Sequence, residues 1–240
     1  MRLLCLPFAG AGASFFRPWS RLGVEGVEVV PVQLPGRERR IAEPLYQDVH
    51  EAADGLLPEV LADLPDPAEP VALFGHSLGA VLAYELAHRL VDAGRPVHRL
   101  FVSGSPGPGA ERTERASDLD EESFVAQVEK FAGYRHPAFD DPEMRALLLP
   151  TLYADVRMHE SYRPRAAKPL PVPITAIRAA DDGLVSAAES AHWREATSAE
   201  FVAVEVPSGG HMYLTADGRV VLDIVAASLA GGTVPANAAH

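Results

Sequence analysis

Short apolar segments alternate along this chain with longer stretches in which apolar residues recur at helical spacing. The short segments are rich in β-branched residues and predict strands, at residues 3–8, 27–33, 71–74, 99–103, 172–177 and 201–206. The longer stretches predict helices, at about residues 46–63, 78–92, 187–196 and 216–229. This alternation predicts an α/β fold, in which helices cover both faces of a mostly parallel central sheet.

One region interrupts the alternation of strands and helices. From about residue 113 to residue 162 there is no clear strand pattern, and apolar residues recur every three or four positions. Pro150 is expected to kink or begin a helix there. Because α/β folds bind their ligands at the carboxyl edge of the sheet, we expect this helical insertion to form a lid over that edge. The alternative is a helical excursion that only fills space.

The length and composition suit one soluble domain spanning residues 1–240, with a flexible tail from about residue 230 to residue 240. No apolar run approaches the roughly 20 residues of a membrane helix. Pro7 interrupts an N-terminal stretch that is too short for a signal peptide. The single cysteine, Cys5, excludes an intrachain disulfide and favours the reducing cytoplasm. A net charge of -12 argues against nucleic acid or anionic membrane as a partner.

The clearest chemical signal is the segment from Gly75 to Gly79, which reads Gly-His-Ser-Leu-Gly. Gly-x-Ser-x-Gly alone is a modest signal, since about one chain of this size in ten would contain it by chance. Here it follows an expected strand directly and leads into an apolar helix, as in a nucleophile elbow. Side chains at either glycine position would collide with the neighbouring strand and helix. Ser77 is therefore the expected nucleophile of an α/β-hydrolase fold; a serine that only caps the helix is the alternative.

A serine hydroxyl needs a base, and in this fold an acid and then a histidine follow the serine along the chain. His211 follows the last expected strand through a glycine-rich loop, which is the expected place of the base. The strand at 172–177 leads to two adjacent aspartates, and either Asp182 or Asp181 can supply the acid. Asp182 is preferred, because its spacing to Val185 matches the frequent Asp-x-x-Val arrangement.

An oxyanion hole must also hold the negative charge that develops on the substrate carbonyl oxygen. The expected donors are the backbone N–H of Leu78 and one N–H from the loop after the first strand, where Ala9 is preferred to Gly10. These residues imply neither a metal nor an organic cofactor.

Several further segments carry a resemblance to one family. They are the opening at residues 4–14, the sequence Gln-Leu-Pro-Gly-Arg-Glu-Arg-Arg at 33–40, the elbow, residues 147–155 and the histidine loop at 209–213. Together they resemble the type II, stand-alone editing thioesterases of polyketide and non-ribosomal peptide synthesis. The resemblance runs from about residue 3 to residue 229, and the segment at 33–40 is far more specific than the elbow.

The resemblance implies hydrolysis of acyl thioesters on the phosphopantetheine arms of acyl or peptidyl carrier proteins, which clears stalled or mis-primed units. Small acyl thioesters are implied as further substrates. Arg37, in a cluster with Arg39 and Arg40, is a candidate contact for the pantetheine phosphate or for the acidic carrier; a solvated loop is the alternative. Two other functions stay open, a general carboxylesterase or lipase and a non-catalytic binding protein with a hydrolase fold.

Overall fold

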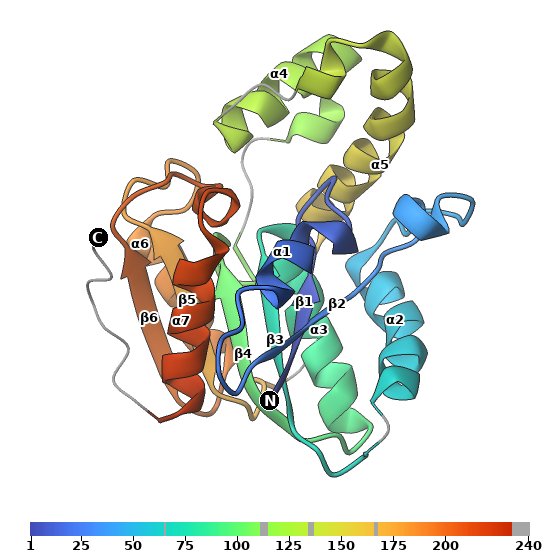
Figure 1. Cartoon of the computed structure of the whole chain (residues 1–240). Coiled ribbons are helices and arrows are strands. Elements are labelled where there is room, and N and C mark those ends of the chain that lie inside the picture. The colour runs from blue at the N-terminus through green and yellow to red at the C-terminus, as the bar shows by residue number, and fades with distance from the viewer. Residues whose placement is uncertain (65, 111–114, 134–136, 166–167, 232–240) are drawn as a thin grey trace.

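Six parallel strands form one sheet in the order β2-β1-β3-β4-β5-β6 (Figure 1). The computed structural model describes residues 1–231 except 65, 111–114, 134–136 and 166–167, so most of the predicted tail lies outside the described residues. The strands are β1 (Arg2–Leu6), β2 (Glu28–Pro31), β3 (Val71–His76), β4 (Val97–Ser103), β5 (Ile174–Ala179) and β6 (Phe201–Val206). The predicted α/β class with a parallel sheet is therefore confirmed.

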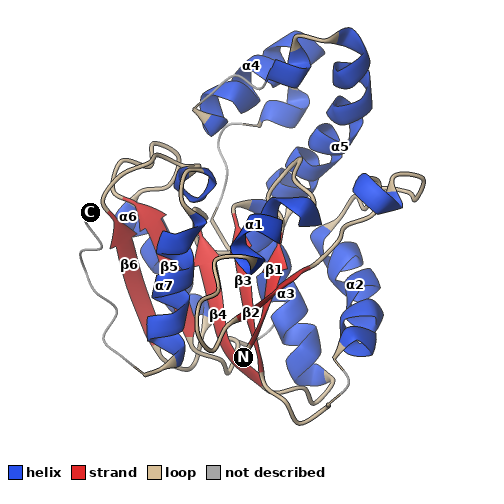
Figure 2. Cartoon of the chain, in the orientation of Figure 1, coloured by secondary structure: helices blue, strands red, loops and turns tan. Residues whose placement is uncertain are grey.

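Strands β1, β3 and β5 are buried on both faces of the sheet, as continuous apolar runs predict. Leu4 and Leu6 of β1 pack on one face with α2 (Val49–Asp63) and α3 (Leu78–Asp92). Leu3 and Cys5 pack on the other face with α1 (Arg17–Ser20) and α7 (Gly218–Leu229). Because successive side chains of a strand point to opposite faces, a single apolar run packs against both layers of helices. Figure 2 shows these helices on the two sides of the strands.

The helix boundaries differ from the sequence pattern where a side chain caps the first turn. Asp48 accepts from the N–H groups of His50 and Glu51, so α2 begins at Val49 rather than near residue 46. The helix predicted over residues 187–196 is α-helical only as α6 (Ala187–Ala191) and then continues as a 3-10 helix. The 3-10 helices are Ala13–Phe16, Glu38–Arg40, Ala116–Asp118, Pro137–Phe139, His192–Ala196 and Tyr213–Thr215.

Two helices, α4 (Glu121–Ala132) and α5 (Pro142–Ser161), occupy the predicted insertion between β4 and β5. They stand beyond the carboxyl ends of the strands (Figure 1). Asp141 caps the start of α5, so Pro150 lies inside this helix and the expectation that it could begin one is wrong. Of the helices in the described part of the chain, none is long and apolar enough to cross a membrane.

A buried carboxylate fixes the segment that follows α5 to the core. Glu85 of α3 is only 2% exposed and accepts a hydrogen bond of 2.7 Å from the hydroxyl of Tyr162. It also accepts from Arg89 at 2.6 Å, and its carboxylate lies 3.2 Å from Nδ1 of His50 in α2. Burial and the adjacent carboxylate both raise the pKa of Tyr162. Glu85 therefore joins α2, α3 and the end of the insertion.

We expect Glu85→Ala to lower the free energy of unfolding by about 3–5 kcal/mol, because it leaves buried polar partners without their counter-charge. Urea denaturation followed by circular dichroism measures this loss. The control is Arg219→Ala, which removes an exposed pair with Asp223 and should cost less than about 0.5 kcal/mol. Equal losses in the two variants would contradict the role given to Glu85.

Candidate active site

Ser77 lies in a sharp turn between β3 and α3. Its backbone has φ 53° and ψ −116°, and its N–H donates to the carbonyl oxygen of Ser103 at 2.8 Å. A positive φ in a residue with a side chain costs roughly 1–3 kcal/mol and persists only where the surroundings enforce it. Ser77 occupies the N-cap position of α3, yet its side chain makes no capping hydrogen bond. The alternative of a capping serine therefore lacks the bond that it requires.

The two glycines of the motif allow this turn by close backbone approach. A Cβ on Gly75 would lie 1.9 Å from the carbonyl oxygen of Gly79. A Cβ on Gly79 would lie 2.4 Å from the carbonyl oxygen of Leu6 in β1. The collisions expected from the sequence are thus with the start of α3 and with the neighbouring strand.

His211 and Asp182 lie together on two loops that follow β6 and β5. Nδ1 of His211 is 3.1 Å from Oδ2 of Asp182, whose side chain is fully buried. Because a carboxylate only accepts hydrogen bonds, Nδ1 carries the proton and Nε2 is the basic nitrogen.

The pKa of Asp182 reflects two opposing effects. Burial acts to raise the pKa of this carboxyl, but the hydrogen bond from His211 and those from the N–H groups of Leu184 and Val185 lower it below its ordinary value. Asp182 therefore stays ionised beside the imidazole.

Asp181 is exposed and has a different set of partners. Its carboxylate accepts from the N–H of Gly210 at 2.9 Å and from that of Gly209 at 3.2 Å. These backbone hydrogen bonds lower the pKa of the Asp181 carboxyl. Of the two adjacent aspartates, Asp182 contacts the imidazole and Asp181 ties down the glycine loop that leads to it.

A buried polar chain beneath the imidazole was not found by sequence reasoning. Nδ1 of His76 lies 2.8 Å from the hydroxyl of Ser103, which lies 2.5 Å from the hydroxyl of Tyr213. The rings of His76 and His211 pack with their centroids 4.9 Å apart. Burial, and then the neighbouring His211, lower the pKa of His76 well below its ordinary range, so it is a neutral packing partner. The only sequence signal was the position of His76 inside the elbow.

A cavity of about 870 Å³ is lined by several of the predicted site residues. Ser77, His211 and the loop at residues 8–12 line it, and apolar side chains of the insertion form much of the remaining wall: Val128, Phe131, Leu148, Leu152 and Val156. The backbone N–H groups of Leu78 and Ala9 have no hydrogen-bond partner among the residues described. Gly10 differs, because its N–H donates to Asp155 at 2.8 Å and is not free to hold an oxyanion.

Arg37, the expected contact for a carrier or phosphate, lines the cavity and also has an internal ionic partner. Arg37 is buried, and its guanidinium binds both carboxylate oxygens of Asp155, at 2.5 and 2.8 Å. Its nitrogens also donate to the carbonyl oxygens of Ala11 and Pro35. The charge of Arg37 is thus paired inside the protein, and its contact with a carrier or phosphate stays a prediction.

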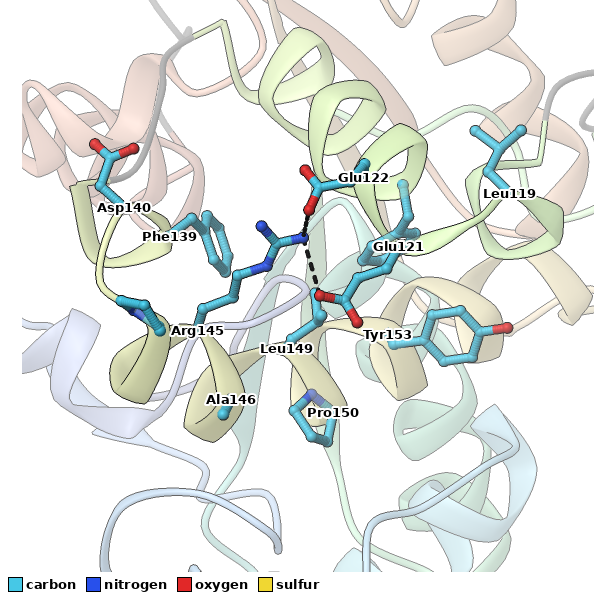
Figure 3. A pocket seen from close by; sticks show the side chains of 12 residues that line it. Leu119, Glu121, Glu122, Phe139, Asp140, Arg145, Ala146, Leu149, Pro150 and Tyr153 are labelled. Carbon is cyan, nitrogen blue, oxygen red and sulfur yellow. Dashed lines mark ion pairs between the residues drawn. The ribbon is translucent and has the colours of Figure 1, made fainter.

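A second hollow, of about 680 Å³, lies within the insertion between α4 and α5. Figure 3 shows Arg145 of α5 directed toward Glu121 and Glu122 of α4, at 2.9 and 2.8 Å. None of the predicted site residues lines this hollow. The hollow that concerns the chemistry is the larger one at the edge of the sheet.

A parallel sheet with a strained serine in a strand–turn–helix elbow defines the α/β-hydrolase class. Within that class, the thioesterase domain model matches residues 1–229. The chain belongs to the thioesterase family, whose members act on thioesters. The predicted family membership and fold are thereby confirmed.

Individual relatives agree with this family. The probable cadicidin biosynthesis thioesterase of Streptomyces griseus is 37% identical over 215 residues, which are 90% of this chain but only 58% of that protein. The structure of the type II thioesterase BorB from the borrelidin biosynthetic cluster is 38% identical, with a TM-score of 0.85 and coverage of 95% of this chain and 92% of that one. YbtT, a type II thioesterase from the yersiniabactin NRPS/PKS pathway, is 26% identical, with a TM-score of 0.87 and coverage of 96% and 93%.

We expect Asp182→Asn to lower kcat for a thioester about 10⁴-fold, since the amide no longer holds the imidazole in the required tautomer. Asp181→Asn should lower kcat less than about tenfold, because it weakens only the loop contacts with Gly209 and Gly210. Steady-state hydrolysis of an acyl-pantetheine thioester measures both. A larger loss in Asp181→Asn than in Asp182→Asn would reverse the two assignments.

Proposed function

We propose that this chain is a serine thioesterase that hydrolyses acyl groups from the phosphopantetheine arms of acyl or peptidyl carrier proteins. In this proposal it edits polyketide or non-ribosomal peptide assembly lines by removing stalled or mis-primed units. The observation that carries the proposal is the cavity lined by both Ser77 and His211, with His211 held by the buried Asp182. The relatives named for biosynthetic pathways support this substrate class.

The first half-reaction forms an acyl-enzyme. The hydroxyl oxygen of Ser77 attacks the thioester carbonyl while Nε2 of His211 takes the hydroxyl proton. Asp182 stabilises the resulting imidazolium. The C–S bond then breaks, and His211 returns the proton to the departing pantetheine thiolate.

The second half-reaction uses water. His211 removes a proton from a water molecule, whose oxygen attacks the acyl carbon of the ester on Ser77. The bond to the serine oxygen breaks, Ser77 regains its proton, and the carboxylic acid leaves. In both halves the N–H groups of Leu78 and Ala9 donate to the carbonyl oxygen as it becomes negative. Neither half-reaction requires a metal or an organic cofactor.

The helical insertion is proposed to act as a lid over the acyl group. Its apolar side chains complete the cavity wall above the sheet edge, where they would exclude water from the bound acyl chain. A cytoplasmic location also stays a proposal; it rests on the single cysteine, whose buried thiol has a raised pKa.

The proposal is tested with a panel of carrier proteins loaded with different acyl groups. We expect release of free acid from several of them, with Ser77→Ala giving no release above the uncatalysed rate. Mass spectrometry of the carrier after mixing measures the loss of the acyl group. Intact acyl-carriers after incubation with wild-type enzyme would refute the proposed substrate class.

A matched oxyester separates this proposal from the alternative of a general carboxylesterase. The thioesterase should give the higher kcat/KM with the acyl-pantetheine thioester, whereas an esterase should prefer the oxyester of the same acyl group. A fluorophosphonate probe tests the alternative of a binding protein, because it labels an activated serine. Absence of labelling at Ser77 would favour that alternative.

A further inference from the structure

Asp155 of α5 is a buried charge that neither the triad nor the oxyanion hole accounts for. Its side chain is only 1% exposed, although it belongs to the helical insertion. Its Oδ1 accepts from Nη2 of Arg37, and its Oδ2 accepts from Nη1 of Arg37 and from the N–H of Gly10. One carboxylate therefore connects the insertion, the loop after β2 and the loop after β1.

The loop after β1 is held by this pair at two successive residues. Asp155 accepts from the N–H of Gly10 at 2.8 Å, and Arg37 donates to the carbonyl oxygen of Ala11 at 2.9 Å. Gly10 has φ +77°, and Leu152 of α5 packs where its side chain would begin. The N–H of Ala9 comes one residue earlier and has no partner in the described chain. The orientation of the loop is thus fixed immediately beside the proposed oxyanion donor.

We propose that Asp155, with Arg37 as its counter-ion, is a positioning residue that holds the N–H of Ala9 in place for the oxyanion. This inference rests on the proposed function, and it assigns to the insertion a part in the chemistry beyond covering the cavity. The carboxylate accepts a hydrogen bond from the N–H of Gly10, which orients the peptide group between Ala9 and Gly10. This orientation limits rotation of the preceding peptide group, which carries the N–H of Ala9. The guanidinium balances the charge, so the carboxylate remains an acceptor although it is buried.

The test compares Asp155→Asn with wild type on an acyl-pantetheine thioester. Asparagine has the same shape but only one acceptor oxygen, so its amide group must face one of the three N–H donors. We expect kcat to fall about 10- to 100-fold, somewhat less than the loss of a whole oxyanion donor, with KM changed less than about twofold. The concentration of active sites is set by complete labelling of Ser77 with a fluorophosphonate, which corrects for any misfolded fraction.

The matched control is Tyr153→Phe, which lies two residues away on α5. It removes a hydrogen bond of 2.7 Å to the carbonyl oxygen of Ser117 within the insertion and leaves the loop after β1 untouched. We expect wild-type kcat and KM from this control. Wild-type kcat in Asp155→Asn, or an equal loss in both variants, would overturn the positioning role.

Two further measurements keep the inference testable if Asp155→Asn folds poorly. The double variant Arg37→Met with Asp155→Leu replaces the pair by apolar side chains and leaves no unpaired buried charge, and we expect the same loss in kcat. In the wild-type enzyme, the Gly10 amide should exchange with solvent more slowly than that of Ala9. Wild-type kcat in the double variant, or faster exchange at Gly10, would refute the inference. Failure of the wild-type enzyme to hydrolyse the thioester would instead refute the proposed function.

Discussion

The close backbone contact at the elbow is the constraint on which the other features of this protein depend. A Cβ on Gly79 would collide with the carbonyl oxygen of Leu6 in β1, and a Cβ on Gly75 would collide with that of Gly79. No side chain fits between these backbones, so β1, β3 and α3 fix the path of the turn. The N–H of Ser77 is bonded to Ser103 of β4, which adds a third strand. The strained backbone of Ser77 is thus enforced by the centre of the sheet rather than by its own loop.

The base side of the site is organised from two neighbouring loops. Adjacent aspartates hold the histidine loop at different points: Asp182 binds the imidazole of His211, and Asp181 binds the glycine N–H groups that precede it. The His76 ring packs against that imidazole from the elbow side. A Cβ on Gly104 would meet both rings, at 2.4 and 3.2 Å. The position of the imidazole therefore depends on β3, β4 and β5 together.

The fold could be predicted from the sequence because its central strands are buried on both faces, which produces clear apolar runs such as 71–74. The elbow could be located because it follows such a run, and the histidine loop because it follows the last apolar segment, at 201–206. The pairing of Arg37 with Asp155 could not be predicted from the sequence, because 118 positions separate the two residues and no local pattern marks them as partners. A cluster of arginines in a sequence predicts a basic surface. Here Arg37 is buried, and Arg40 pairs with Glu43 and Glu59. Net charge and spacing do not show which charges are internally neutralised.

The insertion contributes to the site in two physically different ways. Its apolar residues, such as Leu148 and Phe131, face the cavity through contacts that depend on shape alone. Asp155 instead makes directional, charged hydrogen bonds to the core, and the buried Glu85 fixes the chain just after α5. Substitution at the apolar positions changes the volume offered to an acyl group while these polar anchors remain. The polar anchors, in contrast, tolerate little change, because each one satisfies several buried groups at once. The volume of the cavity and the polar anchoring can therefore vary separately, although both depend on the same insertion.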